Sequence, residues 1–166
     1  MMTSKKLIID ICSGMGGATQ SFLNNPDYEV IKLDSNIKVK PTILCDIRYL
    51  PIKNDLRPEL VWCSPPCTNL SFAKYKNWVN HNIKETFSII GGCLDAIYRL
   101  KPKKWVLENP KGRLRWFMSG SIEIEYATYD MPKKKTNLWS NNNRALKRAF
   151  IPKHISDNIL NWCEEK

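Results

Sequence analysis

A short apolar segment that ends at two consecutive prolines constrains the fold of this chain more than any other feature. The segment Leu60–Cys63 has the composition of a β-strand, and Pro65 and Pro66 close it. Proline fixes φ and has no amide hydrogen, so the chain leaves the sheet there and places Cys67 on a rigid loop. Open α/β sheets bind ligands beyond the carboxyl ends of their strands. The sequence therefore indicates an α/β fold with Cys67 as its candidate reactive residue.

Similar apolar runs recur along the chain and alternate with helical segments. Residues 7–12, 28–33, 41–45, 58–63 and 103–107 predict strands, and residues 122–129 are strand-like in composition. Residues 18–24, 83–100, 113–117 and 155–163 predict helices, and residues 131–140 suggest a hairpin-like turn with a basic cluster. This alternation is typical of a mostly parallel sheet with helices on both faces. Because no repeat or linker interrupts it, we expect residues 1–166 to form a single domain.

Length and composition agree with an ordinary globular protein. The chain has 166 residues, of which 43% are hydrophobic and 25% charged. It has no signal-peptide pattern and no apolar run of the roughly 18–20 residues that a membrane span needs, so we expect a cytoplasmic location. Its six cysteines lack paired zinc-like spacing, which predicts free thiols and no metal site.

The formal net charge of +10 has two interpretations. It can serve solubility, or it can attract a polyanion, because Lys and Arg displace counterions from a phosphate backbone. The stretch 71–82 mixes lysines with the aromatic residues Phe72, Tyr75 and Trp78. It is equally consistent with a lid or nucleic-acid contact and with packing of these rings against the domain.

A glycine-rich turn follows the first strand. Ser13, Gly14, Gly16 and Gly17 lie between that strand and the next helix, in the spacing G-x-G-G. Glycines in such a turn let a ligand approach the backbone, but this spacing differs from the G-x-G-x-x-G of dinucleotide-binding folds. A plain tight turn between strand and helix would account for one glycine, but it does not readily account for three glycines in four positions.

Acidic residues end several of the predicted strands. Asp34 ends the second strand about 20 residues beyond the glycines, where a carboxylate can bond a ribose hydroxyl, and Asp46 ends the third. Either alone could be a helix cap or turn residue, but together they favour an adenosine-type ligand. Glu108 ends the fifth strand, at the edge expected to carry Cys67.

These motifs together resemble those of the DNA cytosine-5 methyltransferases, most closely the short phage- and prophage-type members. Residues 10–17, Asp-Ile-Cys-Ser-Gly-Met-Gly-Gly, resemble the family motif D-L-F-x-G-x-G-G. Residues 64–71 resemble P-P-C-Q-x-F-S, residues 108–110 resemble E-N-V, and residues 135–137 fall where the family has R-x-R. The resemblance implies a Rossmann-like domain that uses S-adenosylmethionine to methylate cytosine C5 in DNA.

The resemblance also implies a role for each matching residue. Cys67 would be the nucleophile, Glu108 would hold the base, and Lys135 would stabilise the thiolate or contact phosphate. The implied cofactor-binding residues are Asp10, Cys12, Ser13, Gly14, Gly16, Gly17, Asp34, Asp46, Ile47, Ser64 and Pro65. The candidate nucleic-acid contacts are Lys74, Tyr75, Trp78, Arg113, Lys133, Lys134 and Asn137.

The sequence departs from the family at several positions. Cys12 replaces the phenylalanine that stacks on adenine, Thr68 replaces glutamine, and Lys135 and Asn137 replace arginines. We find no counterpart of the large target-recognition domain or of the C-terminal motif that completes the cofactor pocket. These departures leave open a separate recognition subunit or a homo-oligomer. We expect the protein to act in the cytoplasm of a prokaryotic or phage-infected host cell.

Two alternative functions remain open at this point. The first is a degenerate relative that binds S-adenosylmethionine or nucleic acid without methylating it, and the second is an RNA cytosine-5 methyltransferase. Two further classes fit less well. Amino-methylating enzymes favour an Asp/Asn-Pro-Pro-aromatic loop, which residues 64–67 do not match, and the G-x-G-G spacing disfavours a nicotinamide oxidoreductase.

Overall fold

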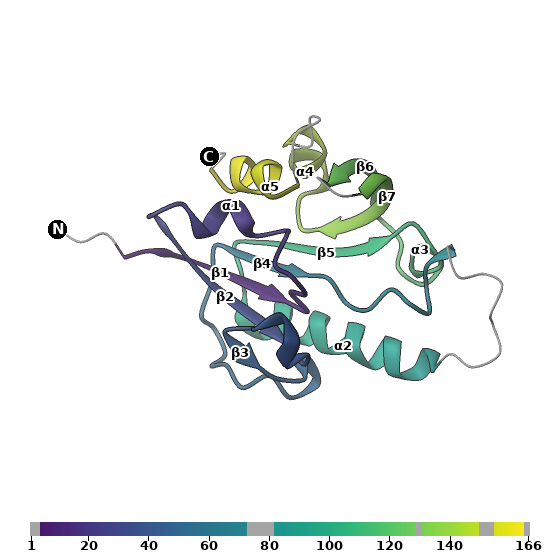
Figure 1. Cartoon of the computed structure of the whole chain (residues 1–166), viewed down its shortest axis with the longest axis horizontal. Coiled ribbons are helices and arrows are strands. Elements are labelled where there is room, and N and C mark those ends of the chain that lie inside the picture. Colours follow the sequence, from purple (N-terminus) through teal and green to yellow (C-terminus); the bar gives the residue numbers. More distant parts are fainter. Residues whose placement is uncertain (1–3, 73–81, 129–130, 150–154, 165–166) are drawn as a thin grey trace.

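The computed structural model describes residues 4–72, 82–128, 131–149 and 155–164, with only the backbone for 126–128, 131–134, 148–149 and 155–156 (Figure 1). The described residues form one seven-stranded sheet in the order β3-β2-β1-β4-β5-β7-β6. The strands are β1 (Lys6–Ile11), β2 (Tyr28–Asp34), β3 (Ile43–Leu44), β4 (Leu60–Cys63), β5 (Lys104–Pro110), β6 (Ile122–Thr128) and β7 (Met131–Ser140).

Strands β1 to β5 pair in parallel, and β7 lies antiparallel between β5 and β6. The order 3-2-1-4-5 is that of nucleotide-binding α/β folds, and the inserted β7 makes the sheet mixed at one end. The predicted mostly parallel sheet is therefore confirmed.

Two details of the strand prediction are wrong. Residues 131–140 form β7 rather than a hairpin-like turn, because their backbone pairs with β5 from Thr136 to Ser140 and with β6 along most of its length. The lysine run precedes four consecutive buried residues, Thr136–Trp139, so the segment lacks the alternation by which a strand is usually predicted. The third strand is only Ile43–Leu44, shorter than predicted.

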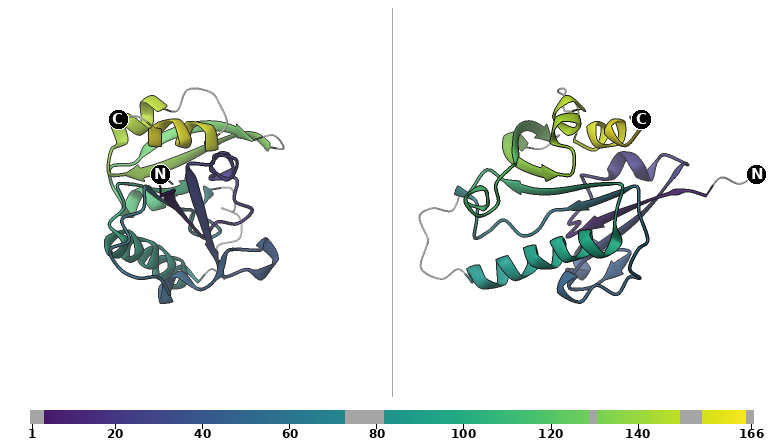
Figure 2. Two further views of the ribbon diagram at one scale, coloured as in Figure 1. Left: turned by 90° about the vertical axis from the view of Figure 1, so that its left-hand side faces the viewer. Right: turned by 180° about the vertical axis from the view of Figure 1, so that it is seen from behind.

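Helices cover both faces of the sheet, as the sequence predicts (Figures 1 and 2). The helix α2 (Ile83–Leu100) lies along one face, while α1 (Gln20–Leu23), α4 (Asn143–Ala149) and α5 (Ile155–Glu164) lie on the other. The remaining helical elements are α3 (Leu114–Phe117) and the 3-10 turns η1 (Ile37–Val39) and η2 (Ile47–Tyr49). The sequence did not predict η1, η2 or α4. No helix in the described part of the chain has both the length and the apolar character needed to cross a bilayer.

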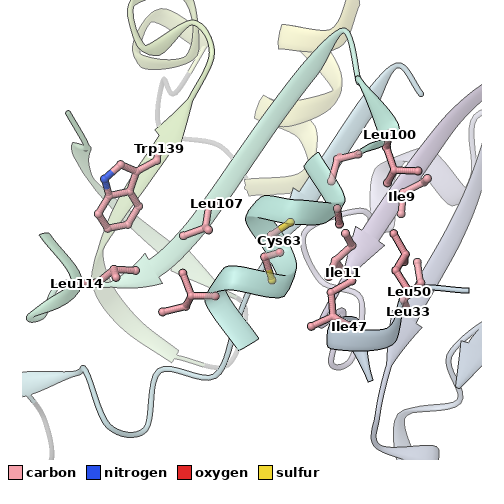
Figure 3. Packing of buried hydrophobic residues seen from close by; sticks show 14 of the residues in the cluster. Ile9, Ile11, Leu33, Ile47, Leu50, Cys63, Leu100, Leu107, Leu114 and Trp139 are labelled. Atoms are coloured by element: carbon pink, nitrogen blue, oxygen red, sulfur yellow. The ribbon is translucent and has the colours of Figure 1, made fainter. Parts of the chain in front are cut away.

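Each face of the sheet has its own hydrophobic core. On the α2 face, side chains such as Ile9, Cys63 and Leu107 pack against the helix (Figure 3). On the other face, Ile8 and Trp62 pack against residues of α1, α4 and α5. Because the central strands are buried on both faces, they read as continuous apolar runs instead of an alternating pattern. This rigid centre fixes the positions of the strand ends.

Candidate active site

The sheet has a topological switch point between β1 and β4. The chain runs outward from β1 to β2 and β3, then returns to the other side of β1 as β4. The two loops that leave β1 and β4 diverge at this point, which opens a crevice beyond their carboxyl ends. In the first of these loops, Gly14 has a φ of 50° and Gly16 a φ of 78°. Glycine adopts this conformation without the steric cost that a side chain imposes.

Asp34 connects the end of β2 to the glycine-rich loop. Its Oδ2 accepts a hydrogen bond of 2.9 Å from the backbone N–H of Gly14, and its Oδ1 accepts one of 2.8 Å from that of Asn36. A carboxylate has about four acceptor sites. Asp34 can therefore support the loop and still accept hydrogen bonds from a ligand, such as the hydroxyls of a ribose.

A cavity of about 210 Å³ lies at this edge of the sheet. Five of the predicted cofactor residues line it, and these are Cys12, Asp34, Asp46, Ile47 and Ser64. The rest of its wall is Leu33, Ser35, Cys45, Arg48, Pro66, Glu85 and Ile89. Apolar side chains beside two strand-end carboxylates suit the flat base and the hydroxyls of an adenosine group. The wall includes Pro66 where the sequence predicted Pro65.

Asp46 is held by Arg48, a residue that the sequence analysis missed. The Asp46 carboxylate caps η2 by accepting from the backbone N–H of Arg48 at 3.0 Å, and the Arg48 guanidinium forms an ion pair with it. These bonds, chiefly those from the guanidinium, hold the pKa of Asp46 below its usual range. Asp46 is thus an ionised acceptor at the cavity wall.

Cys12 differs from the other residues of the wall in its backbone. It has a φ of 53°, a left-handed conformation that few residues other than glycine adopt. Its side chain forms a hydrogen bond with Cys93 of α2, and this bond together with burial raises the pKa of Cys12. A protonated thiol therefore stands where the family has an aromatic ring.

Asp10 is not part of the cavity wall, but its hydrogen bond with Thr19 connects the end of β1 to the far end of the glycine-rich loop. It is buried near the end of β1, and its Oδ2 accepts a hydrogen bond of 2.7 Å from Thr19 Oγ1, just beyond the glycines. Burial raises the pKa of Asp10 to about 7. Its Oδ1 and the hydroxyl of Ser13 are buried without a hydrogen-bond partner among the described residues. Both oxygens are thus polar groups that a ligand in this loop could satisfy. Together with the strand-end carboxylates of Asp34 and Asp46, these groups fit S-adenosylmethionine.

The Cys67 loop is attached to the segment that follows β5. The carbonyl of Cys67 accepts from the N–H groups of Leu70 and Ser71, both at 2.9 Å, which closes a turn. The backbone N–H of Arg113 donates to Leu70 O at 2.8 Å, and Ser71 forms a β-bridge with Gly112. This contact requires glycine, because a Cβ at position 112 would lie 2.1 Å from Leu70 O.

A second attachment brings the Cys67 and Glu108 segments together. Asn109 Nδ2 donates to Pro65 O at 3.1 Å, which joins the neighbour of Glu108 to the loop that carries Cys67. Glu108 itself is 7% exposed and accepts a hydrogen bond from Thr136 Oγ1 of β7, which also contacts Asn109 O at 2.8 Å. Asn109, Gly112 and Thr136 are site-building residues that the sequence analysis did not select. One indication of Asn109 was present in the sequence, namely its place in the stretch 108–110 that resembles the family motif E-N-V.

Three other residues predicted to act in catalysis or nucleic-acid binding do not lie where that role requires. Lys135 lies on the opposite face of β7 from Thr136, and its Nζ is 3.9 Å from Glu125, so the structure does not place it beside Glu108. Asn137 and Arg113 are both buried. Asn137 Nδ2 donates to Ser121 Oγ, and the backbone N–H of Arg113 donates to Leu70 O. Their burial argues against the predicted contacts with a nucleic acid.

Two groups of predicted nucleic-acid contacts cannot be placed. The side chains of Lys133 and Lys134 lie outside the described part, although their backbone belongs to β7. Lys74, Tyr75 and Trp78 fall in a segment that lies wholly outside the described residues.

Comparisons with known proteins agree with these features. No protein-family model matches the chain. The chain is 25% identical over 167 residues to a protein of Frog virus 3 (isolate Goorha) named "Probable DNA (cytosine-5)-methyltransferase", an alignment that covers 88% of the chain and 73% of that protein.

Its fold also matches a crystal structure described as a DNA modification methyltransferase encoded within a prophage of E. coli. The TM-score is 0.61 and the identity 16%, over 91% of the chain, and the chain spans about half of that protein (52%). The chain therefore has the Rossmann-like fold of S-adenosylmethionine-dependent methyltransferases, and its predicted resemblance to the DNA cytosine-5 methyltransferases is confirmed.

Proposed function

We propose that this protein methylates C5 of cytosine in DNA through a covalent bond between Cys67 and the base. The observation that carries this proposal is the attachment of the Cys67 loop to the Glu108 segment through Asn109 and Gly112. This attachment joins a thiol and a buried carboxyl group at the edge of the sheet that also holds the cavity. The similarity to the viral protein supports the same chemistry.

The residues around the cavity would hold S-adenosylmethionine, which supplies an electrophilic methyl group. Asp34 would accept from the ribose hydroxyls, and Asp46 would accept from the amino group of adenine. The glycine-rich loop would admit the rest of the cofactor close to the backbone, because Gly14 and Gly16 carry no side chain. Ser64 and Pro66 line the cavity and directly precede Cys67, so they would place the cofactor and the base at neighbouring positions.

Cysteine is the residue that this reaction needs, because cytosine C5 is a poor nucleophile. Addition of the Cys67 thiolate to C6 forms an S–C6 bond and turns C5 into an enamine-like carbon. C5 would then take the methyl group that S-adenosylmethionine supplies, so that a C5–methyl bond replaces the methyl–sulfur bond and S-adenosylhomocysteine leaves. Loss of the C5 proton to a base restores the double bond and expels the Cys67 thiolate, so the nucleophile is regenerated.

Glu108 would act at N3 of the same ring. When the thiolate adds to C6, negative charge develops on the ring. A proton transferred to N3 would neutralise this charge, and a hydrogen bond to N3 would stabilise it. Glu108 suits this role because its side chain is buried and its orientation is set by Thr136. A carboxyl group excluded from water interacts more strongly with the base than an exposed one.

The substrate and assembly follow from the same proposal. A cytosine in a duplex has to leave the base stack to reach Cys67. The net charge of +10 favours binding to the phosphate backbone. Residues 1–166 would act as a single catalytic domain, with target recognition supplied by a separate subunit or a second copy of the chain.

Covalent trapping tests the proposal directly. Duplex DNA containing 5-fluorocytosine is incubated with tritiated S-adenosylmethionine, and the protein–DNA adduct is measured after denaturation. Fluorine cannot leave as a proton does, so we expect a stable adduct with the natural protein and none with Cys67→Ala. The matched control is Cys163→Ala, which removes a buried cysteine of α5 and should still form the adduct.

The outcome separates the alternatives. An adduct that persists in Cys67→Ala would contradict the assignment of the nucleophile. If an adduct forms with 5-fluorocytosine RNA but not with DNA, the protein is an RNA cytosine-5 methyltransferase. Binding of S-adenosylhomocysteine without an adduct on either nucleic acid would identify a binding protein that does not methylate.

A further inference from the structure

Two large aromatic side chains are exposed beside the candidate active site. Trp116 is 62% exposed and Phe117 is 61% exposed, both on the short helix α3. A single exposed ring is common at a protein surface, but two exposed rings beside a candidate active site are a candidate contact surface.

The position of these rings ties them to the Cys67 loop. The ring of Trp116 lies 5.6 Å from that of Phe72, which directly follows the loop. The ring of Phe117 lies 4.9 Å from that of Phe87 in α2. Since Arg113, at the start of α3, donates to Leu70 O, the aromatic pair is held at a fixed place relative to the loop.

The charges near α3 favour an anionic partner. Lys111, Arg115 and Lys135 lie in this region, and the positive charge of all three lowers the pKa of Glu123, with Lys111 as the main cause through its hydrogen bond. Lys111 Nζ is 2.9 Å from Glu123, and Lys135 Nζ is 3.9 Å from Glu125. Three cations and two carboxylates therefore lie in this region, which leaves one positive charge in excess.

Aromatic rings among cations are the features by which proteins hold single nucleic-acid strands. Bases stack on the rings, while the cations follow the phosphates. An apolar protein partner would match the rings but would make no use of the excess positive charge of this region. The combination thus favours a nucleic-acid strand over a protein.

We propose that Trp116 stacks on a nucleobase of the substrate strand close to the target cytosine. This inference rests on the proposed function for the identity of the strand. Removal of one base from a duplex leaves its neighbours without a stacking partner, and an exposed indole held beside the Cys67 loop can replace that partner. Trp116 would therefore be a nucleic-acid contact that stabilises the opened strand, and it would not take part in the chemistry.

Binding by variants at position 116 tests this proposal. Fluorescence anisotropy would measure the affinity for single-stranded and duplex DNA that contains the cytosine. Stacking on one aromatic side chain is worth enough that Trp116→Ala should weaken binding at least about fivefold. Trp116→Phe keeps a ring and should lose less. The matched control is Tyr98→Ala, because Tyr98 is 81% exposed but lies on the last turn of α2, at the opposite edge of the sheet.

A base analogue reports the contact itself. We expect 2-aminopurine next to the target cytosine to lose fluorescence when the natural protein binds, and to lose less with Trp116→Ala. Unchanged affinity and unchanged quenching in Trp116→Ala would overturn the inference, even if thermal stability falls, because the ring would then be packing only against its own chain. Weaker binding in Trp116→Ala without covalent trapping by the natural protein would uphold the stacking contact and reject the proposed reaction.

Discussion

Replacement of Gly112 by alanine should displace the Cys67 loop without changing any chemical group of the site. The added Cβ would lie 2.1 Å from Leu70 O and 2.9 Å from Leu70 C, whereas real contacts of a Cβ are at least 3.0 Å. The backbone has to separate by about 1 Å, and the bond from Arg113 to Leu70 O resists this movement. Overpacking of this kind costs about 1–3 kcal/mol of folding free energy. A displacement of about 1 Å in a reacting group can reduce the rate about 100-fold.

The assay for Gly112→Ala combines stability and reaction rate. Urea unfolding should show the loss of free energy, and the rate of adduct formation on 5-fluorocytosine DNA should fall about 100-fold. Binding of S-adenosylhomocysteine should change little, since Gly112 is not in the cavity wall. The control is Gly91→Ala, because its Cβ meets no atom within 4 Å and the change should stabilise α2 by about 0.5–1 kcal/mol. A Gly112→Ala protein with natural stability and trapping rate would refute the reasoning.

Three further predictions concern single contacts of the site. Thr136→Val removes the donor to Glu108, so it should destabilise the fold by about 1–3 kcal/mol and slow trapping, and Thr136→Ser should restore the rate. Because the pKa of Asp10 rises from 3.8 to about 7 on folding, the native state binds more protons than the unfolded state between these values. The free energy of unfolding should thus decrease as the pH rises from about 4 to 7, and Asp10→Asn should lack this decrease in urea titrations. Asp34→Ala should weaken S-adenosylhomocysteine binding about 10-fold or more by calorimetry, since hydrogen bonds to a charged group are worth about 1.5–3 kcal/mol, and unchanged affinity would remove Asp34 from the cofactor site.

The sequence was sufficient to predict which edge of the sheet carries the site. Parallel strands present their carboxyl ends together, so residues at the ends of separate apolar runs had to meet there. Asp34 and Asp46 both line one cavity for this reason, and the loop of Cys67 lies against the segment that follows Glu108. Prolines and glycines marked the ends of these runs clearly.

The contacts that set the local geometry could not be predicted in the same way. The antiparallel pairing of β7 decides that Thr136, not Lys135, faces Glu108, and a run of lysines gives no sign of that pairing. The requirement for glycine at position 112 comes from a backbone 42 residues away, at Leu70. The capture of Asp46 by Arg48 depends on the 3-10 turn that follows β3, whose short sequence has no periodicity to detect.

Identification of the methylated product tests the central claim most directly. DNA would be incubated with the protein and S-adenosylmethionine carrying an isotope-labelled methyl group, digested to nucleosides and analysed by mass spectrometry. The account expects labelled 5-methylcytosine from the natural protein and none from Cys67→Ala. Label found instead on an exocyclic amino group, as N4-methylcytosine or N6-methyladenine, would contradict it, because those reactions need no bond between Cys67 and the base.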